Sequence, residues 1–348
     1  MPKLKPLSEQ VVVITGASSG IGLATARMAA EQGAKVVLAA RTNHALAEAV
    51  DGIRQGGGEA SFVTADVGRR EEVEAIAAHA FERFGGFDTW INDASSMIWG
   101  RIGEVPDEDM RRLFDTNFWG VVYGCETALR HLKSAGGAII NVGSLESDRG
   151  FPLQGIYAAS KHAVKAFTDV LRVELQADGA PVSVTLIKPG SMGTPMPQHA
   201  RDYTGLEPKF PPPVYDPHEA AATILRAAEH PVRDAFVGSA ARTTSGLSLL
   251  APRLMDWISA KFVLPMELGG RPATPTDNLH RGHGEAEVYG DHQGSIIRPS
   301  LYSRAARHPA ATLAVAGAAA AGIGAFFLNR ARREQELRLR PEASVFGP

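Results

Sequence analysis

The sequence predicts an α/β fold in which helices cover both faces of a doubly wound parallel sheet. Two observations support this prediction. Short apolar runs alternate with stretches of helical spacing from Val11 to about Val237. A glycine-rich turn, Thr15-Gly16-Ala17-Ser18-Ser19-Gly20-Ile21-Gly22, joins the first apolar run to the first helical stretch. Strands that alternate with helices form βαβ units, and their right-handed crossovers build a parallel sheet.

The individual elements follow from this alternation. Strands are expected at 11–14, 35–39, 60–63, 87–91, 138–142, 182–187 and 235–237. Helices are expected at 20–32, 43–55, 70–84, 107–133, 155–177 and 216–230. The alternating pattern spans about 240 residues, which suits a single domain of this type, so residues 1–240 are predicted to form one domain.

Composition excludes several classes of protein. Of the 348 residues, 44% are hydrophobic and 21% are charged, which is typical of a globular chain with a sizeable core. A net charge of −2 gives no bulk electrostatic reason to expect a nucleic-acid partner. Cys125 is the only cysteine, so an intrachain disulfide is impossible and a reducing, cytoplasmic location is expected. Residues 1–10 show no apolar segment of a secretory signal peptide.

The pattern changes after residue 240. In the extension 241–303, residues 247–264 are predicted to form a lid or interfacial helix, with Pro252 near its start. Residues 265–300 are rich in Gly, Pro and His and are interpreted as a linker or a loose wrapping segment. A solvated linker is favoured and no metal is predicted, because its potential ligands match no defined spacing: His280, His283, Glu285, Asp291 and His292.

The last segment, residues 304–348, contains an uncharged apolar stretch from Pro309 to Leu328. The stretch is long enough to span a bilayer as a helix. Its alanines and glycines weaken the predicted insertion, and the arginines from Arg330 onward oppose transfer of the tail. Three interpretations stay open: a C-terminal membrane anchor, an interfacial or re-entrant helix, and a helix that packs on the domain or on a partner. Membrane association through residues 309–328 is the preferred one.

The glycine turn indicates an anion site. Gly16 can adopt backbone angles closed to other residues, and Gly20 and Gly22 allow a ligand or strand to approach closely. Unpaired N–H groups at the start of the following helix would face the anion, which suits a dinucleotide pyrophosphate. The spacing departs from the common G-x-G-x-x-G pattern, so an ordinary strand-to-helix turn is the alternative.

The end of the second predicted strand favours NADP(H) over NAD(H). NAD-binding chains of this type usually carry an acid here that binds the ribose 2′-hydroxyl. This chain has Ala40 in that position and Arg41 after it, so a 2′-phosphate meets a cation and no like charge. After the third strand, Asp66 could accept a hydrogen bond from the adenine amino group. The alternatives are an exposed surface arginine and a loop or capping aspartate.

Three residues point to proton-transfer chemistry. Tyr157 and Lys161 are four positions apart and share one helix face, where the ammonium would favour the phenolate and lower the pKa of the tyrosine. Ser144 follows the apolar run 138–142 and could orient a substrate oxygen toward the tyrosine. Ser147 competes for this role, and either serine could instead be a turn or N-cap residue.

In combination these residues resemble the short-chain dehydrogenase/reductase family over residues 8–238. The resemblance implies a Rossmann-like, NADP-preferring member with a C-terminal extension, and a homo-oligomer. It implies a catalytic tetrad of Asn117, Ser144, Tyr157 and Lys161, in which Asn117 holds a water for a proton relay. The residues expected to bind the cofactor are Gly16, Ser18, Ser19, Gly20, Ile21, Gly22, Arg41, Asp66, Val67, Asn92, Ala94, Tyr157, Lys161, Pro189, Gly190 and Thr194.

One stretch departs from the family's pattern. The family usually shows Asn-Asn-Ala-Gly after the fourth strand, whereas this chain has Asn92-Asp93-Ala94-Ser95. Asp93 replaces an amide with a charge, and Ser95 adds a Cβ where glycine normally lies against the cofactor. The charge could alter cofactor affinity or local pKa values. Because no member of the tetrad is lost, an enzyme is still expected.

The predicted function is an NADP(H)-dependent oxidoreductase that interconverts a carbonyl and an alcohol by hydride transfer. Tyr157 is the acid or base, and Ser144 holds the substrate oxygen. Apolar side chains near the cleft favour a small hydrophobic substrate, although each could equally belong to the core: Met97, Trp99, Phe151, Leu153, Met192 and Met196. Residues 191–214 resemble the family's mobile substrate loop. The alternatives are a catalytically silent NADP(H)-binding regulatory protein and a membrane-tethered scaffold.

Overall fold

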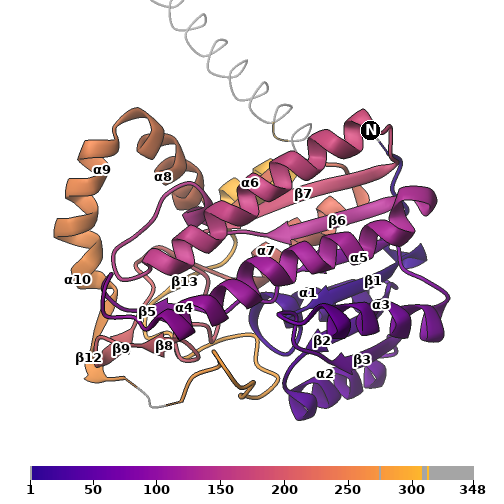
Figure 1. The fold of residues 1–348 in the computed structure, drawn as a ribbon, viewed down its shortest axis with the longest axis horizontal. Helices are drawn as coiled ribbons and strands as arrows, with labels where there is room; N and C mark the ends of the chain where they lie inside the picture. Colours follow the sequence, from indigo (N-terminus) through magenta and orange to yellow (C-terminus); the bar gives the residue numbers. More distant parts are fainter. Residues whose placement is uncertain (1, 274–275, 308–311, 313–348) are drawn as a thin grey trace, which may run out of the picture. The chain divides into compact units, whose positions relative to one another are not determined.

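The computed structural model describes residues 2–273, 276–307 and 312. Its first compact unit, Met1–Ser303, is built on a seven-stranded sheet (Figure 1). The strand order is β11-β7-β6-β4-β1-β2-β3, and every neighbouring pair is parallel. The predicted doubly wound α/β fold is thus confirmed. The strands are β1 (Val11–Thr15), β2 (Lys35–Ala40), β3 (Ala60–Thr64), β4 (Thr89–Asn92), β6 (Gly137–Val142), β7 (Val182–Pro189) and β11 (Asp234–Val237).

The helices of the first 240 residues also lie close to the predicted positions. They are α1 (Gly20–Glu31), α2 (Asn43–Gln55), α3 (Arg70–Phe84), α6 (Gly155–Ala177) and α7 (Pro217–Glu229). The helix predicted at 107–133 consists of three consecutive parts. These parts are α4 (Asp107–Phe114), a π-helical turn η2 (Asp115–Trp119) and α5 (Gly120–Ala135). A π turn inserts an extra residue in the helix and often marks a functional site.

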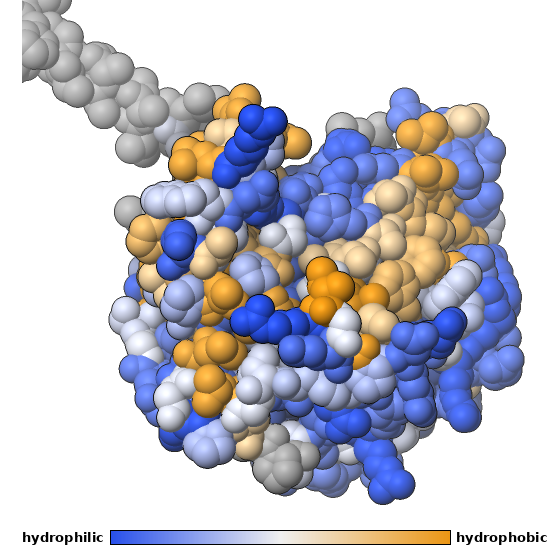
Figure 2. Space-filling view, turned by 60° about the vertical axis from the view of Figure 1, so that its left-hand side comes forward, coloured by the Kyte–Doolittle hydropathy of each residue, from blue (hydrophilic) through white to orange (hydrophobic). Residues whose placement is uncertain are grey.

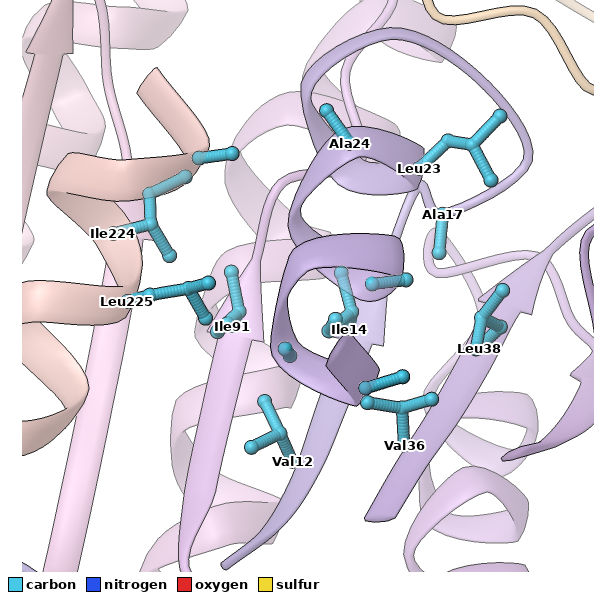
Figure 3. Packing of buried hydrophobic residues seen from close by; sticks show 14 of the residues in the cluster. Val12, Ile14, Ala17, Leu23, Ala24, Val36, Leu38, Ile91, Ile224 and Leu225 are labelled. Carbon is cyan, nitrogen blue, oxygen red and sulfur yellow. The ribbon is translucent and has the colours of Figure 1, made fainter. Parts of the chain in front are cut away.

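Alternate residues of each strand feed two separate cores. Val12 and Ile14 belong to the core under α1 and α7, and Val13 belongs to the core under α3 and α5. On the first face, Leu23 of α1 lies on the side of β2, and Ile224 of α7 lies on the opposite side, near β4 (Figure 3). All five side chains are fully buried. Burial of each contributes roughly 1.5–3 kcal/mol, so this packing holds α1 and the turn before it in place.

The strand order of the sheet reverses at β1, between β2 and β4. From β1 the chain winds outward through β2 and β3, and then returns to β4 on the other side of β1. Thr15 pairs with Asn92 on one side and with Ala39 on the other, so all three strands end at the same edge. Ligands bind outside the carboxyl ends of parallel strands at such a switch point.

Short strands attach the predicted substrate loop to other parts of the chain. Three two-stranded sheets form, namely β5 (Ile98–Trp99) with β8 (Arg201–Asp202), β9 (Leu206–Pro208) with β12 (Leu268–Pro272), and β10 (Val214–Tyr215) with β13 (Ile296–Ile297). Figure 1 shows β5, β8, β9 and β12 near one another, below α10 (Leu264–Met266). The second half of the loop 191–214 is therefore held at three places by pairing with other segments.

The helix predicted at 247–264 begins earlier and is interrupted. It consists of α8 (Ser239–Leu250), α9 (Pro252–Ile258), a π turn η4 (Ser259–Val263) and α10 (Leu264–Met266). Pro252 starts a new helix because proline lacks the N–H that a helix interior needs. This segment, residues 239–266, is here called the helical arm. It carries exposed apolar side chains, including Leu249 and Leu250 at 82% and 84% exposure. Orange apolar patches interrupt the polar surface on this side of the molecule (Figure 2).

Residues 265–273 and 276–300 do not form a solvated linker, so that interpretation is wrong. They wrap against the domain, which is the alternative interpretation. Leu279, Ala286 and Val288 are buried, and the latter two join the core under α1. The reason is that these few apolar side chains meet an existing core, which a periodicity count along the chain cannot detect.

The second compact unit is Arg304–Pro348, of which the structure describes residues 304–307 and 312. Residues 304–307 end helix α11 (Leu301–Arg307). None of the helices in the described residues has the length and apolar character needed to cross a membrane. The predicted stretch 309–328 lies, apart from Thr312, outside the described residues. Its membrane association stays a prediction.

Candidate active site

The glycine turn has no room for side chains at its key positions. Gly16 has a φ of +72°, and a Cβ there would lie 2.7 Å from the backbone of Ala94. A Cβ on Gly22 would lie 2.4 Å from the carbonyl oxygen of Gly16 and 2.9 Å from the carboxylate of Asp93. The turn, the first turn of α1 and the loop after β4 therefore pack backbone to backbone. This cradle fits the diphosphate of a dinucleotide, which the expected cofactor carries.

A first cavity, here called the turn cavity, opens beside the glycine turn and encloses about 130 Å³. It collects most of the predicted cofactor residues from the first four strands. Its lining includes Gly16, Ser18, Ser19, Gly20, Ile21, Arg41, Asp66, Val67, Ala94 and Thr194. Gly22 and Asn92 are not among the lining residues. Gly22 provides the close packing described above, and Asn92 is buried in the sheet, where its amide donates to Asn141 at 2.8 Å.

Two charged side chains that line the turn cavity, Arg41 and Asp66, have protein partners. The Arg41 guanidinium donates to the backbone carbonyls of Leu279, at 3.0 Å, and Asn278. Burial lowers the pKa of Arg41, although a guanidinium remains protonated in proteins. Asp66 accepts from Arg112 at 2.6 Å, and Arg112 also donates to Leu279 at 3.1 Å. Asp66 therefore has an arginine partner that the sequence alone did not indicate.

Residues 277–290, here called the strap, cross the turn cavity. The carbonyl of Glu287 accepts from Gly20 N–H at 2.9 Å, and Gly290 N–H donates to Gly193 at 3.2 Å. The strap thus contacts both the glycine turn and the loop after β7. His280 and His283 belong to it, and they contact Asp109 and His199 respectively. Among the described residues, no group of three or more His, Cys, Asp or Glu side chains is placed so that it could hold a metal ion.

A second cavity, here called the tyrosine cavity, encloses about 270 Å³ and brings three tetrad members together. Tyr157 and Lys161 enter it from the first turns of α6, and Ser144 enters it from the end of the β6 loop. The Lys161 ammonium lies 5.6 Å from the Tyr157 ring centroid and donates to the Val142 carbonyl at 3.0 Å. The two cavities share Ile21, Asp93, Ser95, Met97, Thr194 and Met196, so they form one continuous cleft.

Ser144, rather than Ser147, faces the tyrosine cavity. Ser144 caps the 3-10 turn η3 (Leu145–Ser147), and its hydroxyl accepts from Glu146 N–H at 3.1 Å. Burial raises the pKa of Tyr157, and the same hydroxyl acts to lower it, so the hydroxyl lies close to the phenol. Ser147 is buried behind it and accepts from Ser144 N–H at 3.1 Å. The capping and substrate-orienting interpretations of Ser144 are therefore compatible.

Asn117 lies outside both cavity walls. It occupies the π turn η2 and is fully buried. Its amide donates to the carbonyl of Ser96 at 2.9 Å and to the hydroxyl of Ser160 at 3.1 Å. Its oxygen accepts from Ser96 N–H at 2.8 Å and from the Ser95 hydroxyl at 3.3 Å. The side chain therefore holds the loop after β4 against α6 at Ser160, whose hydroxyl donates to the Tyr157 carbonyl at 2.7 Å.

The pKa of Tyr157 lies above its usual value, opposite to the direction expected from Lys161 alone. Burial is the main cause, and the Glu146 carboxylate adds to it, while hydrogen bonds from Ser144 and Ser95 act against it. Burial also lowers the pKa of Lys161 to about 8, although Asp93 and Glu146 oppose this shift. In the free protein the tyrosine is thus a neutral acid at pH 7, ready to donate a proton.

Asp93 lies at the boundary between the two cavities. Burial raises its pKa to about 7, and the attraction of Lys161 and a hydrogen bond from Gly22 N–H limit the shift. The side chain lines both cavities. The replacement of an amide by an acid therefore introduces a titratable group beside Lys161, as the sequence suggested.

The apolar wall of the tyrosine cavity contains most, but not all, of the predicted substrate residues. Met97, Phe151, Met192 and Met196 line it, together with Pro189 and Gly190. Trp99 and Leu153 belong to the core behind it. Sequence reasoning missed the residues from the helical arm and the segment before α6, because no pattern connects them to the tyrosine: Glu146, Gln154, Met255, Ile258 and Glu267. Phe210, which also lines the cavity, lies in the predicted substrate loop 191–214.

Comparison with known sequences identifies the family of the chain. The model of the short chain dehydrogenase family matches residues 10–204. An uncharacterized oxidoreductase of Bacillus subtilis, YxnA, is 46% identical over 318 residues, which cover 90% of this chain and 89% of that protein. The 11-beta-hydroxysteroid dehydrogenase A of Sesamum indicum is 34% identical over 261 residues, or 72% of this chain and 74% of that protein.

Two solved structures share the fold. A short-chain dehydrogenase/reductase from Burkholderia phymatum in complex with NAD has a TM-score of 0.65 and 27% identity, covering 72% of this chain and 97% of that one. An alcohol dehydrogenase from Thermococcus sibiricus, complexed with 5-hydroxy-NADP, has a TM-score of 0.57 and 29% identity, covering 65% and 94%. The chain therefore belongs to the short-chain dehydrogenase/reductase family and is an oxidoreductase that acts on CH–OH or C=O groups with a nicotinamide cofactor.

Proposed function

We propose that the protein interconverts a carbonyl and an alcohol on a small, largely hydrophobic substrate, with NADP(H) as its cofactor and Tyr157 as the acid or base. The observation that carries this proposal is the meeting of Ser144, Tyr157 and Lys161 in one cavity that continues into the glycine-turn cradle. When bound, the nicotinamide supplies or accepts a hydride.

The side chains have distinct roles in this proposal. Tyr157 donates a proton to the carbonyl oxygen during reduction, and its raised pKa keeps that proton in place at pH 7. Ser144 donates a hydrogen bond to the same oxygen and stabilises its developing negative charge. Lys161 supplies positive charge next to the tyrosine ring. Asn117 positions the loop that carries Ser95, whose hydroxyl contacts Tyr157. In the oxidation direction Tyr157 acts as the base.

Arg41 supports the preference for NADP(H). Two of its N–H groups hold the strap, and a guanidinium has five, so it retains donors for a 2′-phosphate. Ala40 leaves no acid to repel that phosphate. The cradle at Gly16 and Gly22 would receive the diphosphate, and Pro189, Gly190 and Thr194 would lie near the nicotinamide end.

The apolar wall supports a hydrophobic substrate. Phe151, Met192, Phe210, Met255 and Ile258 surround the space in front of Tyr157. Relatives named as hydroxysteroid dehydrogenases act on hydrophobic alcohols, which agrees with this wall. We also propose a division of the chain into residues 1–240, 241–303 and 304–348, in which the middle part closes the substrate side of the cleft.

We further propose a homo-oligomeric assembly, which sedimentation would test.

Turnover of a panel of hydrophobic aldehydes, ketones and quinones tests the function. We expect the wild type to oxidise NADPH faster than NADH with members of the panel. Tyr157→Phe should lose turnover by about 10²–10⁴-fold and still bind NADPH, as measured by fluorescence. Tyr123→Phe, at a tyrosine that stacks on Trp119 outside the cleft, is the matched control and should retain activity. Full turnover in Tyr157→Phe would overturn the assignment, and NADPH binding without turnover of any compound would favour a silent binding protein.

A further inference from the structure

One wall of the tyrosine cavity carries three buried hydrogen-bond acceptors that the proposed reaction does not use. Glu146 belongs to η3, Gln154 caps the start of α6, and Glu267 follows α10. All three line the cavity, with exposures of 5%, 2% and 0%. Oε2 of Glu146, Oε1 of Gln154 and both carboxyl oxygens of Glu267 have no hydrogen-bond partner. Buried polar atoms in folded proteins almost always have one, so these atoms require an explanation.

The two carboxyl groups lie close enough to influence each other. Burial raises the pKa of Glu267 to about 8, and the Gln154 amide offsets this only in part, at a geometry that falls short of a hydrogen bond. The pKa of Glu146 lies well above its usual range because of burial and the nearby Glu267, although the Phe151 N–H and Lys161 oppose the shift. Glu146 also raises the pKa of Tyr157. Glu146, one member of the pair, therefore lies close enough to Tyr157 to influence the group that is proposed to transfer the proton.

The chemistry of this wall selects among ligands. A wholly apolar ligand would leave the four acceptor oxygens dry and unpaired, and an anion would meet two acids. An ammonium group offers three donors and a positive charge, which would allow one of the two protonated carboxyls to ionise. A hydroxyl offers a single donor. An ammonium is thus the group that satisfies most of the unpaired acceptors.

We propose that the substrate carries a protonated amino group that binds between Glu146 and Glu267 while its carbonyl or alcohol carbon lies against Tyr157. The inference rests on the proposed function for the reacting group, but not for the amine site. The wall residues Phe210, Met255 and Ile258 then hold the apolar body of the substrate. Binding transfers a carboxyl proton to the solvent, because the ammonium arrives already charged.

Calorimetry of the full chain with benzylamine, and with benzyl alcohol as the neutral probe, tests the amine site without any turnover. Titrations at pH 7 in two buffers of different ionisation enthalpy measure the protons exchanged. We expect benzylamine to bind more tightly than benzyl alcohol and to release about one proton per molecule bound, because Glu267 is mostly protonated at this pH. Equal binding of the two probes, or tighter binding of benzyl alcohol, would overturn the proposal.

Matched variants locate the effect. Glu267→Gln keeps the shape of the side chain and should weaken benzylamine about tenfold to hundredfold, abolish proton release and leave benzyl alcohol unaffected. Glu146→Gln should act in the same direction. Glu59→Gln, at an exposed glutamate paired with Lys35, is the control and should behave as the wild type. Both buried variants remove an unpaired acid, so their thermal transitions should persist. An unchanged benzylamine affinity in both folded variants would contradict the proposal.

Turnover separates this inference from the proposed function. NADPH oxidation is compared for 4-(aminomethyl)acetophenone and 4-ethylacetophenone, which differ only in the amino group. We expect the amine to be reduced with the lower KM, and Glu267→Gln to remove that advantage. Reduction of the ethyl compound together with failed amine binding would sink the amine site alone. Benzylamine binding with proton release, but no reduction of any carbonyl, would sink the proposed function alone.

Discussion

The two ends of the cleft treat their polar groups differently. In the turn cavity, Arg41 and Asp66 are paired with protein partners, namely the strap carbonyls and Arg112. In the tyrosine cavity, Glu146, Gln154 and Glu267 are buried with unpaired oxygens. The protein sets the positions of these two paired side chains before any ligand binds, so Arg41 and Asp66 are preorganised. Unpaired buried groups raise the energy of the free protein and are compensated only by a ligand of matching chemistry.

Asp93 lies between the two ends, and its substitution should have the largest effect on stability. A carboxyl whose pKa is about 7 when folded and 3.8 otherwise binds more protons in the folded state, so the free energy of unfolding falls as pH rises from about 4 to 7. This decline should be absent in Asp93→Asn, so at pH 7 the variant should be more stable than the wild type by up to about 4 kcal/mol. Loss of the attraction between Asp93 and Lys161 would reduce this gain. Denaturant unfolding at several pH values measures it.

The Asp93→Asn variant should retain a smaller slope, since Glu146 and Glu267 also have raised pKa values. An unchanged pH profile would show that Asp93 is hydrated in solution. Water would then reach the side chain of Asp93, and the region between the two cavities would not be buried.

Gly22→Ala tests whether the end of the cleft at the turn cavity depends on backbone contact. Its Cβ would lie 2.4 Å from the Gly16 carbonyl oxygen, so α1 must shift and the free energy of unfolding should drop by about 3 kcal/mol, with weaker NADPH binding. Gly52→Ala is the control within helix α2, where a Cβ meets nothing within 4 Å, and it should stabilise by about 0.5–1 kcal/mol. Similar thermal shifts in the two variants would argue against the close-packed turn.

Arg41→Met separates the two tasks of Arg41, strap binding and phosphate recognition. Loss of a charge-assisted hydrogen bond should weaken NADPH binding about tenfold to hundredfold and leave NADH nearly unchanged. Arg27→Met is the matched control, because Arg27 contacts the strap at the Ala286 carbonyl and does not line the turn cavity. Equal losses for NADPH and NADH in Arg41→Met would mean that the arginine acts only through the strap.

Asp109→Asn should have the smallest effect, on the outer attachment of the strap. Asp109 accepts hydrogen bonds from Arg201, Tyr203 and His280. Although burial raises the pKa of Asp109, these bonds lower it below its usual value, so their stabilisation is present above about pH 4 and is lost at lower pH. The variant should lose about 1 kcal/mol at pH 7 and converge on the wild type in acid. A constant difference down to pH 3 would contradict this role.

The first 240 residues were largely predictable because their signals are local. Strand and helix periods follow from each residue's near neighbours, as at Val12 to Ile14, and the glycine turn follows from the space beside Gly16 and Gly22. The region after residue 240 was predicted less well. Its helices break at Pro252. Residues 277–290 resemble a linker in sequence, and only the folded structure shows that Leu279 and Val288 are buried.

The sequence by itself determined the parallel sheet, the glycine turn and the spacing that places Tyr157 and Lys161 on one helix face, because each depends on residues a few positions apart. Only the tertiary structure decided that Ser144 rather than Ser147 faces the tyrosine, and that Arg41 meets the strap. It also brought Glu146 and Glu267 to one wall, although they are far apart along the chain. Such contacts depend on packing and burial in three dimensions, and these determine both the partners and the pKa values of the groups.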